Sequence, residues 1–547
     1  MKITSALICS LLLFSGTLVA QWTQYHGSPN RNDEASCITL DNQNNIIAGG
    51  FTITANGDAD MAIIKYSQNG GLQWQYFYNN NNGNYEDRAY GIVVDQNDNI
   101  FITGYTSENS DDFCTIKLTA SGTVGWVRKF DGGGEDRAYG IVVDNLNNII
   151  VTGTSYRGPS TGIDIFTRKY DAAGNQLWSY TYNGTGNGED RPYGIIVDQS
   201  DNIIITGTTY SLSSISLDYL TFQLSPSGSL VWADIYNGSG GGEDRAYGIV
   251  TDQADGKIFV TGMSQGIGSG FDYLTRGYDS YGALLFSKDF NGTGNSDDIA
   301  RSITHTTNNE IVITGSSRSG PATGSENILT IRYDENGDLL WSVCDSGTTN
   351  NTDIAYKVVT PQNSNNYVTV LGYTTGISGK DILLLSYSNT GNLFRKYIIN
   401  GSGNKNDIAY DGISINNDLV YAGFVTNSNN NTDFITSLIT QSLLTEVIKD
   451  PEIIPVSFKL YQNYPNPFNP ETKIKFDIPS GLGSGITVSL KVYDILGNEI
   501  STPVNRFLEA GSYEITLKAD NQMSSGIYFY TLKAGGFIQT NKLIVLK

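Results

Sequence analysis

The sequence predicts an all-β protein, and two observations carry this prediction. A unit of about 50 residues recurs eight times along the chain. Each copy contains four short runs rich in Ile, Val, Tyr, Phe and Thr, separated by Asn, Asp and Gly. A four-stranded repeat of this length is typical of a β-propeller blade. We therefore predict an eight-bladed β-propeller closed by an N-terminal strand over residues 21–439, followed by a small immunoglobulin-like β-sandwich.

The first 20 residues have the layout of a cleaved secretory signal. A basic start is followed by an apolar run over residues 6–14 and by small residues up to Ala20. We expect export and a mature chain that begins at Gln21. Only Cys37, Cys114 and Cys344 would then remain, which is too few and too irregular for a disulfide framework. No later segment is apolar enough to predict a transmembrane helix.

One short block marks the repeat. It reads Glu-Asp-Arg-Ala-Tyr-Gly at residues 86–91, and four extended runs follow within that copy, at 89–95, 99–105, 112–118 and 125–130. Several runs are almost continuously apolar or β-branched, as expected for sheets covered on both faces by neighbouring sheets. The aspartate of the block recurs in every copy, at Asp33, Asp87, Asp136, Asp190, Asp244, Asp298, Asp353 and Asp407.

The tryptophans follow the same period. Five of the six stand four residues after a turn glycine, and the sixth, Trp22, opens the mature chain. Phe286 and Arg395 take the place of tryptophan in two copies. We interpret the tryptophans as core anchors in the fourth strand of each blade.

The phase of the repeat predicts how the ring closes. Residues 22–27 have the pattern of a lone fourth strand, whereas the last copy, residues 407–439, stops after its third strand. Pairing these two ends would complete one blade and remove the free sheet edges.

Charge and composition exclude several classes of function. The last 91 residues hold nine basic and seven acidic side chains, so the residues ahead of them carry a net charge of −23, against −21 for the whole chain. An acidic propeller of this kind repels nucleic acid. The two histidines lack the spacing of a metal or catalytic site. The glycine-rich loops at 184–188 and 292–294 lack the helix and Lys-Ser/Thr of a phosphate loop.

We predict no catalytic residue, no cofactor and no dedicated metal site. Calcium stays open as an alternative at residues 95–99 and 334–338, where oxygen side chains alternate. The favoured interpretation of these two segments is that Asp and Asn form tight turns there.

The repeated block leads from the outer strand of one blade into the inner strand of the next, so it should line one rim of the central channel. Asp87, Arg88 and their equivalents could link neighbouring blades through charge-assisted hydrogen bonds, which is the favoured interpretation. Alternatively, arginines and tyrosines form a half-ring that binds a carbohydrate or a peptide. Later copies lose the block, which would make such a site lopsided. The candidate ligand-binding residues are Arg88, Tyr90, Arg137, Tyr139, Arg191, Tyr193, Arg245 and Tyr247.

A linker at residues 440–456 separates the propeller from a distinct tail, residues 457–547. The tail combines a proline-rich entry with alternating strand patterns that predict the sandwich. Its motif residues are Tyr464, Pro465, Asn466, Pro467, Phe468, Asn469 and Pro470.

Two resemblances follow from these motifs. The proline-rich motif, Val-Tyr-Asp-Ile-Leu-Gly at 492–497, Ser-Gly-Ile-Tyr at 525–528 and the Lys-Leu-Ile-Val-Leu-Lys end resemble the type A C-terminal sorting domain of type IX secretion cargo. The Gly-Glu-Asp-Arg-Ala-Tyr-Gly and Asp-Tyr-Leu-Thr repeats resemble bacterial β-propeller repeat families of exported Bacteroidetes-type proteins. The resemblance implies passage through the periplasm to the cell surface or the extracellular space, with the type IX machinery as partner.

Our first hypothesis for function is a non-catalytic binding or adhesion scaffold that presents a rigid face to an extracellular glycan or protein. The alternative is an extracellular enzyme that acts on glycans with carboxylates alone, because paired acids can suffice for glycoside hydrolysis.

Overall fold

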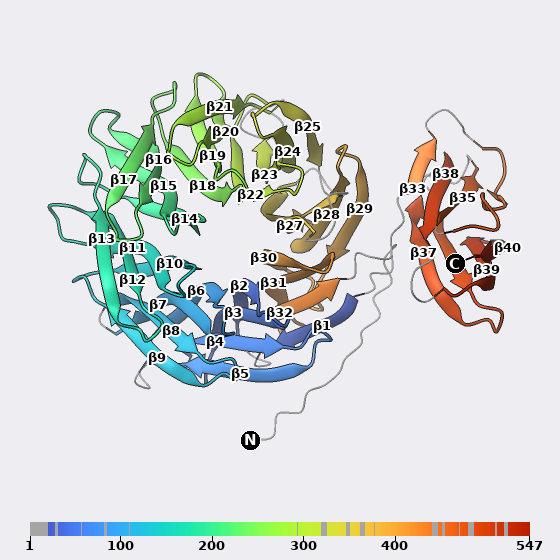
Figure 1. The fold of residues 1–547 in the computed structure, drawn as a ribbon, viewed down its shortest axis with the longest axis horizontal. Helices are drawn as coiled ribbons and strands as arrows, with labels where there is room; N and C mark the ends of the chain where they lie inside the picture. The colour runs from blue at the N-terminus through green and yellow to red at the C-terminus, as the bar shows by residue number, and fades with distance from the viewer. Residues whose placement is uncertain are drawn as a thin grey trace. The chain divides into compact units, whose positions relative to one another are not determined.

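The computed structural model divides the chain into two compact units, Ala20–Ile439 and the part that follows Ile439 (Figure 1). The predicted signal segment lies outside the described residues except for Ala20. The structure describes residues 20–27, 31–55, 57–80, 85–108, 110–292, 294–318, 325–345, 351–361, 367–376, 378–439, 447–450, 455–469, 471–479, 486–508, 511–518 and 523–546.

All regular elements of the described residues are β-strands, and none of these residues forms a helix that could cross a membrane. In the first unit the strands form eight four-stranded antiparallel sheets. The first four sheets are β2 (Asp33–Leu40), β3 (Ile46–Ile53), β4 (Ala59–Tyr66), β5 (Leu72–Tyr78); β6 (Asp87–Val94), β7 (Ile100–Ser107), β8 (Asp111–Leu118), β9 (Val124–Phe130); β10 (Asp136–Val143), β11 (Ile149–Tyr156), β12 (Ile163–Tyr170), β13 (Gln176–Tyr182); and β14 (Arg191–Val197), β15 (Ile203–Ser211), β16 (Ser216–Leu224), β17 (Leu230–Tyr236).

The remaining sheets continue in the same order, and the eighth takes its fourth strand from the start of the chain. They are β18 (Asp244–Thr251), β19 (Ile258–Gly266), β20 (Gly270–Tyr278), β21 (Leu284–Phe290); β22 (Asp298–His305), β23 (Glu310–Arg318), β24 (Glu326–Asp334), β25 (Leu339–Asp345); β26 (Ile354–Val359), β27 (Tyr367–Thr375), β28 (Lys380–Ser388), β29 (Leu393–Ile399); and β30 (Ile408–Ile415), β31 (Asp418–Thr426), β32 (Thr432–Ile439), β1 (Ala20–His26).

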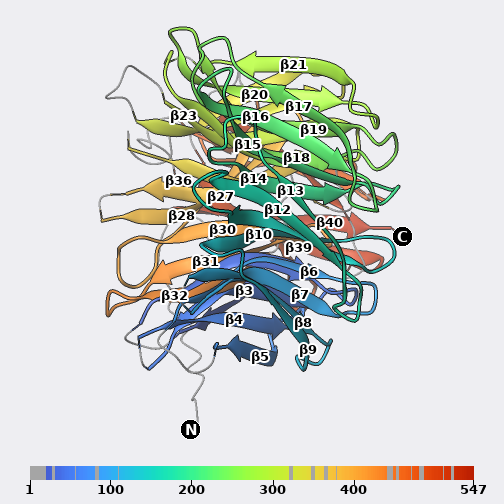
Figure 2. The same cartoon turned by 90° about the vertical axis from the view of Figure 1, so that its left-hand side faces the viewer.

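The first strand of each sheet lies innermost in the arrangement (Figure 1). Each first strand contacts the first strands of the neighbouring sheets, and β30 contacts β2. The view at right angles shows the sheets stacked side by side, with strands of consecutive sheets adjacent (Figure 2). This radial arrangement of four-stranded sheets confirms the predicted β-propeller class.

Apolar side chains fill the spaces between consecutive sheets. One cluster joins Ile47 and Ile63 of the first sheet to Ile100, Ile102 and Ile116 of the second, and all five side chains are buried. The second and third strands are therefore covered on both faces, which explains their nearly continuous apolar runs. The core is distributed over the boundaries between sheets.

Tryptophan side chains in the fourth strands contact the sheet that follows in the chain. Trp74 of β5 donates its indole N–H to the carbonyl oxygen of Ala120 at 3.0 Å, and its ring covers Gly122 in the β8–β9 turn of the next sheet. Gly122 has a φ of +82°, and a Cβ there would lie 2.7 Å from the Trp74 ring. Glycine is required both by the backbone and by the contact.

The same geometry explains both exceptions to the tryptophan pattern. Phe286 covers Gly337 in the same way, without the indole hydrogen bond. Arg395 faces the boundary with the eighth sheet, whose third and fourth strands, β32 and β1, come from opposite ends of the chain. No hairpin joins these two strands, so that boundary has no turn glycine for an aromatic ring to cover.

The recurrent aspartate of the block is fully buried in every copy. Asp190 accepts hydrogen bonds from the Gly184 amide at 2.8 Å, the Thr209 hydroxyl at 2.6 Å and the Tyr210 amide at 3.0 Å. Gly184 belongs to the loop that arrives from the preceding sheet, whereas Thr209 and Tyr210 belong to the second strand of the new one. The carboxylate thus ties the connecting loop to the sheet that follows it, which justifies its burial.

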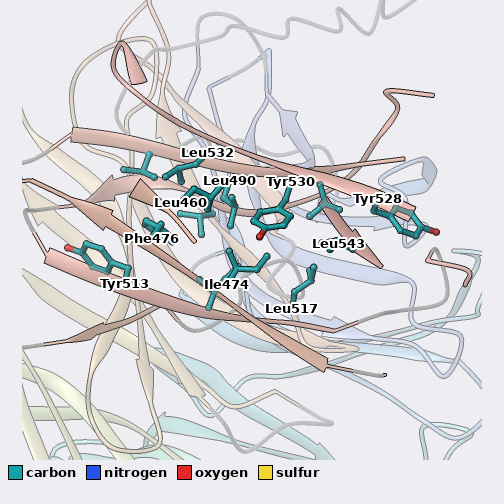
Figure 3. Packing of buried hydrophobic residues seen from close by; sticks show 14 of the residues in the cluster. Leu460, Ile474, Phe476, Leu490, Tyr513, Leu517, Tyr528, Tyr530, Leu532 and Leu543 are labelled. Atoms are coloured by element: carbon teal, nitrogen blue, oxygen red, sulfur yellow. The ribbon is translucent and has the colours of Figure 1, made fainter. Parts of the chain in front are cut away.

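The tail unit is a sandwich of two four-stranded sheets around one core (Figure 3). Phe476, Leu490, Tyr530 and Leu532 are among its fully buried side chains and come from both sheets. One sheet comprises β33 (Val447–Asp450), β38 (Gly511–Lys518), β35 (Glu471–Ile478) and β34 (Lys459–Leu460), and the other comprises β37 (Glu499–Leu508), β36 (Ile486–Tyr493), β39 (Gly526–Ala534) and β40 (Phe537–Val545).

Replacing Asp190 by alanine should lower the free energy of unfolding by about 2–4 kcal/mol, because two backbone amides and one hydroxyl lose their buried acceptor. Chemical denaturation of the purified protein measures this change. Thr209→Val removes only one of the three donors and should cost less. An Asp190→Ala variant as stable as the wild type would contradict the structural role of the carboxylate.

Stability should also depend on pH in an unusual direction. Burial raises the pKa of Asp60, Asp164, Asp381 and Asp407 to about 6. A carboxyl whose pKa is higher in the folded than in the unfolded state favours folding when protonated. Its contribution is complete below the unfolded pKa near 4 and is lost as the pH rises through about 6.

We therefore expect the melting temperature to rise by several degrees when the pH is lowered from 7.5 to 5, measured in a metal-free buffer. For Asp41, burial opposes ionisation, but hydrogen bonds from Lys65 and Asn45 hold the pKa below its usual value. The contribution of Asp41 is therefore lost only at more acidic pH. A melting temperature that falls steadily between pH 7.5 and 5 would contradict the expectation.

Candidate functional site

A β-bulge occurs at one equivalent position in the first strand of every sheet. In β6 the ladder with β7 skips one residue between Ala89 and Gly91, which leaves Tyr90 as the bulged residue. Bulges redirect a side chain and are common beside binding sites. The eight bulged residues are Ser36, Tyr90, Tyr139, Tyr193, Tyr247, Arg301, Tyr356 and Tyr410.

Tyrosines at this position contact each other between neighbouring sheets. The ring centroids are 5.6 Å apart for Tyr90 and Tyr139, 4.9 Å for Tyr193 and Tyr247, and 5.5 Å for Tyr356 and Tyr410. The side chains are half-buried, and Tyr193 is 37% exposed. The innermost strands therefore present three pairs of adjacent tyrosines, and we call these six residues together with Arg301 the tyrosine ring.

The tyrosine ring contains neutral hydroxyl groups and one charged side chain, that of Arg301. Burial raises the pKa of Tyr193, Tyr247 and Tyr356, so their hydroxyl groups stay neutral at physiological pH. Arg301 takes the ring position between Tyr247 and Tyr356 and lowers the pKa of both, against the effect of burial. Arg301 donates to the Ser316 hydroxyl at 2.7 Å.

The four candidate arginines precede the ring tyrosines by two residues and have partners of their own. Arg88 pairs with Glu86 at 3.3 Å and lies 4.1 Å above the ring of Phe51 in the preceding sheet. Arg245 pairs with Glu243 at 2.7 Å, and Arg191 pairs with Glu189. These arginines are about one-third exposed.

Arg137 makes the fullest set of contacts to a neighbouring sheet. Its guanidinium forms an ion pair with Asp111 of β8 and lies 5.1 Å from the ring centroid of Tyr105 in β7. Beside this pair is a hollow of about 630 Å³ between the second and third sheets, lined by Ser107, Glu108, Ser110, Asp111, Gly134, Glu135, Tyr156 and Ile163.

The sequence reasoning missed part of this arrangement. It followed arginine and tyrosine as a pair, which ends at Tyr247, and so expected a lopsided half-ring. The structure places Tyr356, Tyr410 and Arg301 at the same bulge as the earlier tyrosines. The signal was present, because tyrosine stands three residues after the recurrent aspartate in six copies, two of which have isoleucine in place of arginine.

The two segments considered for calcium form turns. The Asp95 carboxylate accepts the amides of Asn97 and Asn99, both at 2.8 Å, and the side-chain amide of Asn99. Asp334 accepts the amides of Asn336 and Asp338 in the same way. In both turns an aspartate oxygen is bonded to the backbone of its own turn, as side-chain capping of a tight turn requires.

The proline-rich motif of the tail runs beside its last strand. The amide of Phe468 donates to Ile544 O at 3.0 Å, Leu546 donates to Phe468 O at 2.9 Å, and Asn466 Oδ1 accepts the Ile544 amide at 2.9 Å. Phe468 is buried in the sandwich core, whereas Tyr464 is 80% exposed. Pro465, Pro467 and Asn469 are also exposed, and Pro470 lies outside the described residues.

Two family models match separate parts of the chain. Residues 462–546 match the model of the secretion system C-terminal sorting domain, and residues 81–110 match that of a β-propeller repeat. No curated protein matches the chain.

Several solved structures resemble the chain at low identity. Drosophila semaphorin 2a aligns at 9% identity and a TM-score of 0.41, covering 98% of this chain and 99% of its own. A protein of unknown function from Dyadobacter fermentans aligns at 8% identity and a TM-score of 0.37, covering 78% of this chain and 100% of its own. An α-L-arabinofuranosidase from Fusarium graminearum aligns at 10% identity and a TM-score of 0.35, covering 65% of this chain and 93% of its own. Similarity this low supports no functional inference.

The family matches carry the identification, because the tail motifs and the repeat each match a known model in the unit where the structure places them. The chain is a β-propeller protein with a C-terminal sorting domain that directs its secretion through the type IX system to the cell surface or the extracellular space.

Proposed function

We propose that the first unit is a closed, eight-bladed propeller in which the N-terminal strand completes the last blade. Three observations support this. Strand β1 pairs antiparallel with β32, with Trp22 opposite Leu438. Trp22 also donates its indole N–H to Gln68 O at 2.8 Å and covers Gly70 of the first sheet, as Trp74 does with Ala120 and Gly122 at the next boundary. Finally, β30 contacts β2.

Deleting residues 21–30 should lower the melting temperature of the propeller sharply, because β32 loses its partner strand and the first sheet loses the Trp22 contact. Differential scanning calorimetry on the mature protein measures this. Trp22→Phe, which keeps a ring over Gly70 but loses the hydrogen bond, should cause a smaller decrease. An unchanged melting temperature after the deletion would refute closure by this strand.

We further propose that the propeller is a non-catalytic scaffold that binds an extracellular ligand at the tyrosine ring. The observation that carries this proposal is the bulge at every first strand, which places an aromatic residue at six of the eight equivalent positions. Tyrosine offers an apolar face together with a hydroxyl group and is favoured at binding surfaces.

Neutral glycans are the first ligand class to test. The acidic unit repels anions, while neutral hydroxyl groups and aromatic faces suit uncharged sugar rings. A binding role is favoured over the carboxylate-based enzyme because Glu86, Glu189 and Glu243, the acids beside the ring, pair with arginine.

For the tail, we propose that the secretion machinery reads the exposed face formed by Tyr464, Pro465, Pro467 and Asn469. Phe468 and Asn466 fasten this face to β40. The buried side chain therefore positions the motif, and the exposed ones remain accessible to a partner.

Replacing Tyr193 and Tyr247 together by alanine should weaken glycan binding at least tenfold, because their adjacent aromatic faces would be lost. A glycan array on the secreted protein identifies the ligand, and calorimetry then measures the affinity. Tyr281→Ala is the matched control, since Tyr281 is 85% exposed and lies in the β20–β21 turn outside the tyrosine ring. Equal binding by the double variant and the wild type would contradict the proposal.

A further inference from the structure

Three aspartates from two sheets meet at the boundary between the second and third sheets. Asp112 lies in β8, Asp136 begins β10, and Asp131 lies in the loop that joins the two sheets. Each offers a carboxylate oxygen, and these three oxygens lie within 4.8 Å of one another. None of the three aspartates forms an ion pair within the part of the chain that the structure describes.

The third carboxylate distinguishes this boundary from the others. The residue before the loop glycine, at the position of Asp131, is asparagine at four other boundaries: Asn183, Asn237, Asn291 and Asn400. Asn183, Asn291 and Asn400 each donate to a second asparagine four residues later, which closes the loop. The loop after Asp131 is shorter and has Glu135 at that spacing. Asp131 instead accepts the Gly133 amide at 2.7 Å.

A buried hydroxyl group adds a second, independent observation. Ser155 pairs with Asp136 in the β10–β11 ladder and is fully buried. Among the residues that the structure describes, its Oγ has no hydrogen-bond partner, and neither has Oδ1 of the fully buried Asp136. Burial raises the pKa of Asp136, and the nearby Ser155 hydroxyl only partly offsets this rise. Oγ and Oδ1 lie next to each other without meeting the geometry of a hydrogen bond. At the next boundary the equivalent hydroxyl, on Thr209, bonds Asp190 at 2.6 Å.

The charges around the three aspartates are unbalanced. Burial and then the negative charges of Asp131 and Asp136 raise the pKa of Asp112 to about 6. The nearest cations are Lys129, which acts on Asp112, and Arg157, which acts on Asp136. Both have other partners: Lys129 donates to Asn80 Oδ1, and Arg157 donates to the Thr181 hydroxyl.

We propose that Asp112, Asp131, Asp136 and the Ser155 hydroxyl form a calcium site that joins the second and third sheets. All four donors are oxygen atoms, which Ca²⁺ prefers. Calcium–oxygen distances of about 2.4 Å allow ligand oxygens up to about 4.8 Å apart, and the three carboxylate oxygens lie within this limit. Backbone carbonyls or water would complete the coordination. The site lies apart from the two turn segments that the sequence suggested for calcium.

The test is calcium titration of the secreted full-length protein after chelation, followed by calorimetry and thermal unfolding. Asp131→Asn is the informative variant, because asparagine is the natural residue at the equivalent position of other boundaries. Wild-type protein should bind one calcium ion more than Asp131→Asn. Calcium should also raise its melting temperature by a few degrees more than that of the variant. Without calcium, the two melting temperatures should agree.

Asp171→Asn is the matched control, since Asp171 caps an exposed turn in the same sheet as Asp136. This variant should keep the wild-type calcium response, and Asp112→Asn should lose it as Asp131→Asn does. Equal calcium binding by wild-type protein and Asp131→Asn would overturn the proposal, as would no calcium binding by the wild type. A stability difference that follows pH and not calcium would assign a shared proton to the three aspartates and would also overturn it.

Discussion

The propeller depends on one buried hydrogen-bonding centre that recurs in every sheet, the aspartate at the start of the first strand. A sheet in this fold must connect its outermost strand to the innermost strand of the next sheet, so each connecting loop crosses a boundary. The aspartate accepts loop amides on one side and donors from the second strand on the other, as Asp190 does with Gly184, Thr209 and Tyr210. Every copy retains it fully buried.

This arrangement constrains the residues around it. A side chain at Gly184 would place its Cβ 2.2 Å from Thr209 Oγ1, so the loop must approach the strand through glycine. Burial also raises the pKa of the aspartate in several copies, which means that the fold accepts an electrostatic cost to hold the loop. The tryptophans act at the opposite edge of each sheet, where the outer strand covers the turn of the next one. Hydrogen bonds to a buried aspartate thus join neighbouring sheets near their inner strands, and aromatic packing joins them near their outer strands.

Because these two contacts hold most of the boundaries, other positions are free to vary. The bulged residue after the aspartate is tyrosine in most copies, but serine at position 36 and arginine at position 301. The loop position before the glycine is asparagine in most copies and aspartate at position 131. The residues that distinguish both candidate sites are therefore variations on a repeat whose packing does not depend on these positions. A repeat protein can acquire a local site in this way without altering the other copies.

The order and type of the elements could be predicted from the sequence, because each copy repeats the same alternation of β-branched runs and turn residues. The tail could be recognised because its proline-rich motif and strand patterns are specific. The tyrosine ring was predicted only in part. Tyr90, Tyr139, Tyr193 and Tyr247 were named, but Tyr356 and Tyr410 were not, since their copies have isoleucine in place of arginine. A bulge depends on the register between two strands, and a single sequence does not reveal that register.

The sequence by itself determined the all-β repeat, the exported character of the chain and the sorting tail, because these depend on local patterns and on motifs of adjacent residues. Only the tertiary structure decided which residues of different sheets meet. Asp112 and Asp136 lie 24 positions apart, and each has equivalents throughout the repeat, so no local pattern marks their meeting with Asp131. Contacts across a boundary depend on how one sheet packs against the next, and this packing brings together residues that the sequence separates.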